Sequence, residues 1–185
     1  MESSSRLIED FVNTLHKDLH GDEEQLSSPE ALAEWMRGHG LGDVERATRG
    51  ELARAVALRE SLRQLLLRNN GVEVDSDEAC DVLSDTSRRA KLGLRFEDAL
   101  PVLIPEAGGV DGALGRIVAA MQELVADGSW PRLKACRSRD CEWAFFDTAK
   151  NHSRAWCSMS SCGNREKARS FRKRHAPETP QRATR

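Results

Sequence analysis

The sequence predicts a mainly α-helical protein with one small β-hairpin, an α+β arrangement, followed by a small module built around four cysteines. Apolar residues recur at helical spacing through most of the first 130 positions, and one stretch within them alternates with period two. Four of the five cysteines gather near the C-terminus. We therefore expect a helical domain over 1–130, the cysteine module over 131–176 and a disordered tail over 177–185.

Two helices are expected before residue 40. The first runs until Gly21 and has apolar residues at helical spacing, namely Leu7, Ile8, Phe11, Val12, Leu15 and Leu19. The second begins at Ser28-Pro29, because Ser is a favoured N-cap and Pro fits the first turn. Gly38 is expected to end this second helix.

Capping residues also define the next two expected helices. Thr48-x-x-Glu51 is a capping box that opens the longest helix, which Asn69-Asn70-Gly71 ends. Asp75-x-x-Glu78 opens a fourth helix that runs to about Arg89. Cys80 lies within this fourth helix and is expected to be a small core residue.

The hydrophobic period then changes from helical to alternating. Pro101 and Pro105 restrict the alternating segment to short or edge strands, so we expect a β-hairpin. Its apolar residues are Leu92, Leu94, Phe96, Val102 and Ile104. A fifth helix is expected from near Asp111 to Gly128.

Charge is distributed unevenly along the chain. The segment 132–185 has 14 Lys and Arg against 5 Asp and Glu, a net charge of +9, whereas the first 131 residues carry −11. An acidic body joined to a basic module is a common layout of nucleic-acid-binding proteins. No stretch is apolar enough to cross a membrane and the N-terminus has no signal-peptide core, so we expect a cytoplasmic protein without a membrane partner.

The four C-terminal cysteines have the spacing C-x4-C-x15-C-x4-C. They are Cys136, Cys141, Cys157 and Cys162. Thiols stay reduced in the cytoplasm, and two pairs separated by such a loop suit one tetrahedral Zn²⁺. The sequence therefore predicts one structural zinc in a treble-clef-like or ribbon-like four-cysteine zinc finger. Four thiolates would leave no open coordination position, which argues against a catalytic metal and against an enzyme.

A basic helix is expected directly after the second cysteine pair, from Asn164 to about His175. Arg165, Arg169 and Arg172 share one face of it, and Ala168 and Phe171 are expected to pack back on the finger. The candidate nucleic-acid-binding residues are Arg154, Asn164, Arg165, Lys167, Arg169, Arg172, Lys173 and Arg174. A solvated charged helix remains the alternative.

Three residue roles stay open from the sequence. Asn164 can contact adenine or a phosphate, or can cap the helix. Trp156 can shield the metal or stack on a base. Asn13-Thr14 are poor helix formers inside an expected helix, so they form either a locally bonded turn or the lining of an effector pocket.

Two parts of the chain resemble a known family. Cys162-Gly163-Asn164-Arg165 spells CGNR and, with Phe145-Phe146-Asp147-Thr148, resembles the CGNR zinc finger. Phe11-Val12-Asn13-Thr14 and Leu58-Arg59-Glu60 resemble its N-terminal partner, the ABATE domain, also called a putative stress-induced transcription regulator. The resemblance implies a bacterial transcription regulator whose finger binds DNA, with the four cysteines as zinc ligands.

The leading hypothesis is therefore a regulator that binds double-stranded DNA. Its N-terminal domain would sense a small-molecule effector or form a homodimer. A homodimer is expected because one finger alone offers little contact area with DNA. Two alternatives remain: an RNA- or ribosome-associated zinc protein, and a zinc-stabilised scaffold whose basic helix meets an acidic partner, including the chain's own body.

Overall fold

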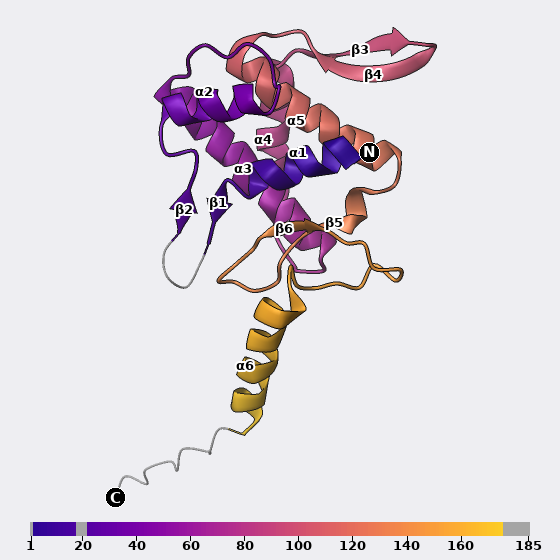
Figure 1. Ribbon diagram of the computed structural model, residues 1–185. Coiled ribbons are helices and arrows are strands. Elements are labelled where there is room, and N and C mark those ends of the chain that lie inside the picture. The colour runs from indigo at the N-terminus through magenta and orange to yellow at the C-terminus, as the bar shows by residue number, and fades with distance from the viewer. Residues whose placement is uncertain (1, 18–21, 176–185) are drawn as a thin grey trace, which may run out of the picture.

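The computed structural model describes residues 2–17 and 22–175, without the side chains of Glu2 and Lys173. Leu19, Gly21 and the expected tail at 177–185 lie outside the described residues. Within the described ranges there are six α-helices and three two-stranded antiparallel sheets (Figure 1). The mainly helical class with small hairpins is confirmed.

The first helix is shorter than its apolar spacing suggests. Helix α1 spans Glu2–Val12, and the chain then turns into strand β1 (Leu15–His16), which pairs with β2 (Glu23–Glu24). The Thr14 hydroxyl donates to the Phe11 carbonyl at 2.8 Å, a local bond that competes with helix continuation. The expectation that Leu15 extends this helix was wrong.

Capping residues predicted the second and third helices correctly, but not the start of the fourth. Helix α2 spans Pro29–Gly38, and the Ser28 hydroxyl accepts from the Ala31 amide. Helix α3 spans Arg49–Asn69 behind a complete capping box of Thr48 and Glu51. Helix α4 spans Asp77–Arg89. Its N-cap is Ser76 without a side-chain cap, and Asp75 Oδ1 accepts from the Asp77 amide, so the capping box expected at Asp75 and Glu78 was wrong. Cys80 is exposed, so the expectation of a core cysteine was also wrong.

The expected hairpin is present as β3 (Leu92–Glu97) and β4 (Leu100–Pro105). Its turn residues Asp98 and Ala99 have φ of 48° and 64°, as a tight two-residue hairpin turn requires. Apolar side chains near its tip face solvent: Leu94, Phe96 and Leu100 are 65%, 70% and 68% exposed. Helix α5 (Gly109–Ala126) follows and packs against β4.

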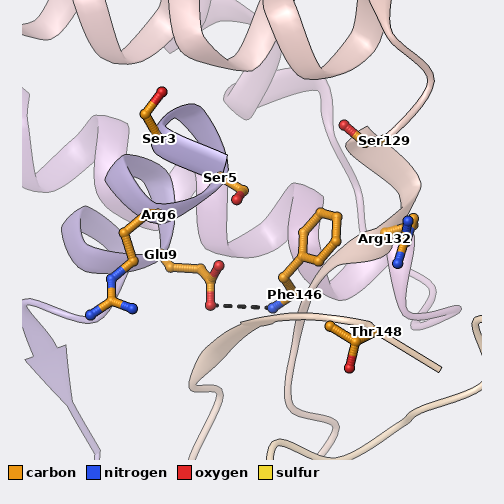
Figure 2. Close-up of a pocket in the computed structure, with 8 residues that line it drawn as sticks. All are labelled: Ser3, Ser5, Arg6, Glu9, Ser129, Arg132, Phe146 and Thr148. Atoms are coloured by element: carbon orange, nitrogen blue, oxygen red, sulfur yellow. Dashed lines mark hydrogen bonds between the residues drawn. The ribbon is translucent and has the colours of Figure 1, made fainter. Parts of the chain in front are cut away.

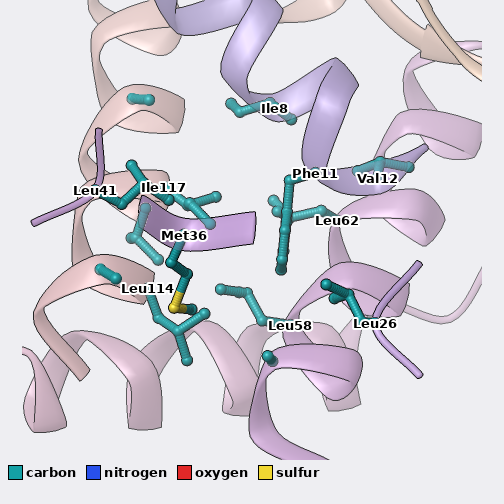
Figure 3. Close-up of a cluster of buried hydrophobic side chains, with 14 of the residues drawn as sticks. Ile8, Phe11, Val12, Leu26, Met36, Leu41, Leu58, Leu62, Leu114 and Ile117 are labelled. Atoms are coloured by element: carbon teal, nitrogen blue, oxygen red, sulfur yellow. The ribbon is translucent and has the colours of Figure 1, made fainter. Parts of the chain in front are cut away.

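The core lies where α1, α2, α3 and α5 meet (Figure 3). Its fully buried side chains include Ile8, Phe11, Leu32, Met36, Leu58, Leu62, Leu114 and Ile117. The same core continues into the C-terminal module through Leu133, Ala135 and Ala144. The hairpin of the C-terminal module therefore packs into the core of the body, whereas Cys136, Cys141, Phe145 and Cys162 form a second, smaller buried cluster. No described helix has the length and apolarity that crossing a membrane demands.

Candidate metal centre and nucleic-acid interface

The finger is a short hairpin followed by a helix. A 3₁₀ turn (Trp130–Arg132) leads into β5 (Leu133–Ala135), which pairs with β6 (Ala144–Phe146). The first cysteine pair lies on the connection between these strands, where the Cys136 amide donates to the Trp143 carbonyl at 2.9 Å. The second pair lies around a π-helical turn (Met159–Gly163) that continues directly into α6 (Asn164–Arg174).

These connections bring the four cysteine sulfurs together. All four lie within 4.8 Å of one another, and Cys157 Sγ is 3.6 Å from Cys141 Sγ and 3.7 Å from Cys162 Sγ. A tetrahedron with Zn–S bonds of about 2.3 Å has S–S edges of roughly 3.8 Å. The arrangement therefore fits one structural Zn²⁺ with four thiolate ligands, as the sequence predicted.

Electrostatics indicate that a cation belongs at this centre. Hydrogen bonds from the Cys141 and Cys157 thiols lower the pKa of Cys136 to about 2. The contact with Cys136 raises the pKa of Cys141 to about 12. Four thiolates held this close would repel one another, and a divalent ion bound to all four would offset that repulsion.

Neighbouring side chains support and cover the cluster. Arg165 Nη2 donates to Cys162 Sγ at 3.0 Å, which stabilises a thiolate. Trp143 and Trp156 pack against the cysteines, so Trp156 shields the metal site. Gly163 has φ of −63°, which any residue adopts, so a tight turn does not explain this glycine. A Cβ there would lie 2.8 Å from Met159 Sδ, but the Met159 side chain is 52% exposed and can move aside.

A buried ion pair holds the loop that leads to the second cysteine pair. Lys134 Nζ lies 2.8 Å from Asp147 Oδ2 and also donates to the His152 carbonyl at 2.6 Å. The Asp147 carboxylate accepts from the amides of Ala149 and Arg154. Burial raises the pKa of Asp147, but Lys134 and the two amides outweigh it and the net pKa is lowered. The sequence analysis quoted Asp147 within a motif without recognising this role.

The finger is joined to the body by side chains that bond to backbone groups. The Asn13 amide bonds both to the Ala144 amide, at 2.8 Å, and to its carbonyl, at 3.0 Å. On the other side, Asn70 Nδ2 donates to the carbonyls of Ala135 and Ala155 at 2.7 and 3.0 Å. The Asn70 carbonyl in turn accepts from Arg137. These contacts fix the finger to α1 and to the end of α3.

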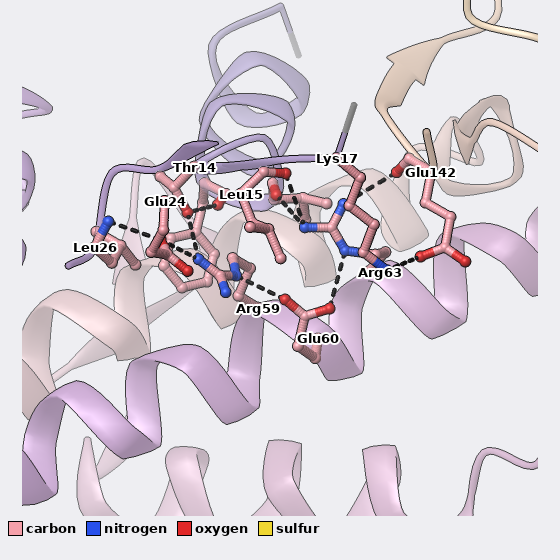
Figure 4. A network of polar contacts seen from close by, with 11 residues as sticks. Thr14, Leu15, Lys17, Glu24, Leu26, Arg59, Glu60, Arg63 and Glu142 are labelled. Atoms are coloured by element: carbon pink, nitrogen blue, oxygen red, sulfur yellow. Dashed lines mark hydrogen bonds and ion pairs between the residues drawn. The ribbon is translucent and has the colours of Figure 1, made fainter. Parts of the chain in front are cut away.

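Two buried arginines of α3 complete the junction (Figure 4). Arg63 donates to the Val12 carbonyl at 2.7 Å and to the Glu142 carbonyl at 3.0 Å, so it touches α1 and the finger. Arg59 donates to Thr14 Oγ1, and Glu60 forms ion pairs with both arginines. Burial raises the pKa of Glu60, but Arg63 and Arg59 outweigh it and the pKa is lowered.

The junction accounts for the unusual pair Asn13-Thr14. Both side chains are buried, and their polar atoms bond to Ala144, Phe11 and Arg59. Of the two roles that the sequence left open, the locally bonded turn is the one that Thr14 has, because its hydroxyl donates to the Phe11 carbonyl. Neither residue lines the cavity between α1 and the finger or the hollow beside Cys141 and Cys162, and effector binding at these positions stays a prediction.

Helix α6 projects away from the body (Figure 1). Ala168 is exposed and Phe171 is 57% exposed, stacking on His175 at a centroid distance of 4.1 Å. The expectation that these two residues pack back on the finger was wrong, because both side chains face solvent.

The predicted nucleic-acid-binding residues divide into two groups. Arg154 and Arg165 are engaged inside the finger, with the Cys157 carbonyl and Cys162 Sγ respectively. Arg169 lies on the surface but pairs with Asp140 and Glu166, each at 2.9 Å. The other group lies along the projecting helix, where the exposed side chains are Lys167, Arg172 and Arg174, and Lys173 occupies the same segment.

The geometry at the start of α6 decides whether Asn164 caps this helix. The residue at the N-cap position of α6 is Gly163, which itself has helical geometry, so the chain enters α6 without a side-chain cap. The exposed Asn164 amide donates to the Ser160 carbonyl at 3.3 Å. Helix capping by Asn164 was therefore wrong, and nucleic-acid contact stays a prediction.

Comparison with family models matches two adjoining regions of the chain. Residues 5–128 match the ABATE model, described as "Putative stress-induced transcription regulator", and residues 132–175 match the CGNR zinc finger. No curated protein matches the chain. The second match contains all four cysteines of the metal centre, and the first covers well over half of the chain. The protein therefore belongs to the ABATE family and carries a C-terminal CGNR zinc finger.

Proposed function

We propose that the protein is a transcription regulator that binds double-stranded DNA through α6. The family description names a transcription regulator and implies no catalysis. The observation that carries the proposal is the exposed basic helix, which stands clear of the acidic body next to the zinc centre (Figure 1). Such a helix can enter a major groove or lie along phosphates.

The contacts made by the α6 side chains guide which of them we propose as DNA contacts. Arg165 serves the zinc thiolate and Arg169 is already paired, so both are poor choices for a test of DNA contact. Arg172 and Arg174 lie at the free end of α6, and neither forms an ion pair with any residue in the described ranges. We propose these two arginines, with Lys167 and Lys173, as the main phosphate contacts, and Asn164 as a base or phosphate contact.

The test is a fluorescence-anisotropy titration of zinc-loaded protein with a labelled random duplex pool. Arg172→Ala/Arg174→Ala is compared with Arg88→Ala/Arg95→Ala, which removes two exposed arginines from the body. Losing two phosphate contacts should reduce the slope of log K against log salt by about 2 and weaken binding at low salt. The control pair should bind as the unaltered protein does. Equal affinity of the α6 pair would contradict the proposed face.

Competition with structured RNA separates the two kinds of nucleic acid. We expect duplex DNA to be preferred, because a helix fits the major groove of B-form DNA but not the deep, narrow groove of A-form RNA. A clear preference for RNA would instead favour the RNA- or ribosome-associated alternative. The scaffold alternative in which α6 meets its own body has no support from a helix that projects away from it.

A homodimer, a small-molecule effector and a cytoplasmic location belong to the same proposal. A helix of 11 residues gives little contact area, so two copies would serve specificity better than one. The exposed apolar side chains of the β3–β4 hairpin, Leu94 and Phe96, are the surface we propose for a second copy. Sedimentation should show a dimer that Phe96→Ser converts to monomer. A monomer at all concentrations would contradict this part.

A further inference from the structure

A cavity of 610 Å³ lies between α1 and the finger (Figure 2). Its volume falls within the range of small-molecule sites, roughly 300–1,000 Å³. The walls come from three parts of the chain: α1, the connection after α5, and the end of β6 with the segment that follows it. A molecule bound there would touch the ABATE domain and the zinc finger at once.

Arg132 is the residue of the cavity wall that is best suited to bind an anion. Its Nε donates to the Asp147 carbonyl at 3.1 Å, and its guanidinium carbon lies 4.7 Å from the centre of the Phe146 ring. Its two terminal nitrogens have no hydrogen bond or ion pair with any residue that the structure describes. A planar guanidinium held by an aromatic ring and a backbone bond is well placed to bind a carboxylate or phosphate through two parallel hydrogen bonds.

The other walls define the rest of the ligand. Figure 2 shows the Phe146 ring standing between Arg132 and Glu9, so an aromatic molecule can pack beside it. Glu9 accepts the Phe146 amide at 3.2 Å and leaves an acceptor face on the α1 side. A second anionic group would be repelled there, whereas a hydroxyl or amine could donate to it. Hydroxyls of Ser3 and Thr148 add small polar contacts at the rim.

We propose that this cavity binds a small aromatic acid. Its carboxylate or phosphate group pairs with Arg132, its ring packs against Phe146, and a hydroxyl or amine at the far end donates to Glu9. Arg132 also bonds to the backbone of Asp147, whose carboxylate holds the loop before Cys157. Occupancy is therefore coupled to the finger, and an effect of the ligand on DNA affinity rests on the proposed function.

Binding is tested without DNA, by calorimetric titration of zinc-loaded full-length protein. The probes are 4-hydroxybenzoate, benzoate, phenyl phosphate, inorganic phosphate and neutral phenol. We expect 4-hydroxybenzoate to bind more tightly than benzoate, and phenol at least about tenfold more weakly than either. Phenyl phosphate against benzoate shows which anionic group the site prefers, and inorganic phosphate shows how much of the binding needs the ring.

Three variants locate the site. Arg132→Gln keeps one donor towards Asp147 but loses the fork, so its Kd for 4-hydroxybenzoate should rise at least about tenfold. Thr148→Trp fills the cavity from an exposed position and should do the same, which guards against a folding defect at Arg132. Arg95→Gln, on the distant hairpin, should leave Kd unchanged.

Saturable aromatic-acid binding that both cavity variants weaken supports the proposal. Absence of saturable binding by the acids, or binding that Arg132→Gln and Thr148→Trp both leave unchanged, overturns it. DNA affinity is then measured with and without 4-hydroxybenzoate. A protein that binds the acid but not DNA would reject the proposed function and leave the cavity assignment standing, so the two failures are distinguishable.

Discussion

The side-chain amide of Asn13 pairs with both backbone polar groups of Ala144, 131 positions away in the sequence. It occupies the open edge of β6 as a third strand would, and it ties the end of α1 to the strand beside the metal centre. The regulatory domain and the zinc finger thus meet through defined bonds, which offers a route for coupling between them.

This pairing predicts a stability defect in Asn13→Ala. The variant leaves a buried amide and carbonyl of Ala144 without partners, which costs about 1–3 kcal/mol each when water cannot replace them. The free energy of unfolding from urea titration should fall accordingly. Asn151→Ala, in an exposed loop of the finger, is the matched control and should be nearly neutral. A stability loss no larger than that of the control would show that the pairing contributes little.

The buried Lys134–Asp147 pair predicts a larger effect. Lys134→Met leaves the Asp147 carboxylate buried without its cation, a change that typically costs about 3–5 kcal/mol. Urea unfolding of zinc-loaded protein at pH 7 measures it, with the exposed Lys150→Met as control. If both variants unfold at the same urea concentration, the ion pair is not what holds this loop.

The Lys134–Asp147 pair also makes the free energy of unfolding depend on pH. Because the folded-state pKa of Asp147 is lowered, its contribution is present above the unfolded value of about 3.9 and is lost as pH falls through the folded pKa. In Lys134→Met the pKa of Asp147 should rise, so the gap between variant and unaltered protein should narrow as pH falls from 7 towards 4. A gap that stays constant over this range would contradict the assigned ion pair.

Arg165 predicts a separable effect on the metal. Its contact with Cys162 Sγ stabilises a ligand thiolate without supplying a ligand, and loss of such partners typically lowers metal affinity by about tenfold to a hundredfold. Competition with a zinc indicator should therefore show weaker zinc binding by Arg165→Met. Lys167→Met removes an exposed charge from the same helix and should retain full zinc affinity. Equal zinc affinity in both variants would leave Arg165 without a role at the metal.

The sequence correctly predicted the features that are determined by residues close together in the chain or by distinctive residue types. Ser28 and Thr48 cap the helices they were expected to cap, and the alternating run ending at Pro105 forms the hairpin. The cysteine spacing predicted a cluster whose sulfurs do converge. In each case the residues that act together are close in sequence or chemically distinctive.

The wrong and missing predictions concern features that are determined by contacts between distant parts of the chain. Leu15 continues a helical pattern of apolar residues. The chain nevertheless turns there, because the Thr14 hydroxyl donates to the Phe11 carbonyl and Arg63 donates to the Leu15 carbonyl. Phe171 has the spacing of a buried residue, but α6 projects beyond anything it could pack against. Asn13 and Asn70 bond to backbone carbonyls, which carry no signal in the sequence, so the junction between body and finger could not be foreseen.

The zinc content of the purified full-length protein tests the central claim most directly. Elemental analysis, combined with hydrogen exchange over residues 133–174, should give one zinc per chain and a finger that loses protection when the metal is chelated. Absence of stoichiometric zinc in a protein whose finger remains protected would contradict a metal-organised module, and with it the placement of α6 for DNA.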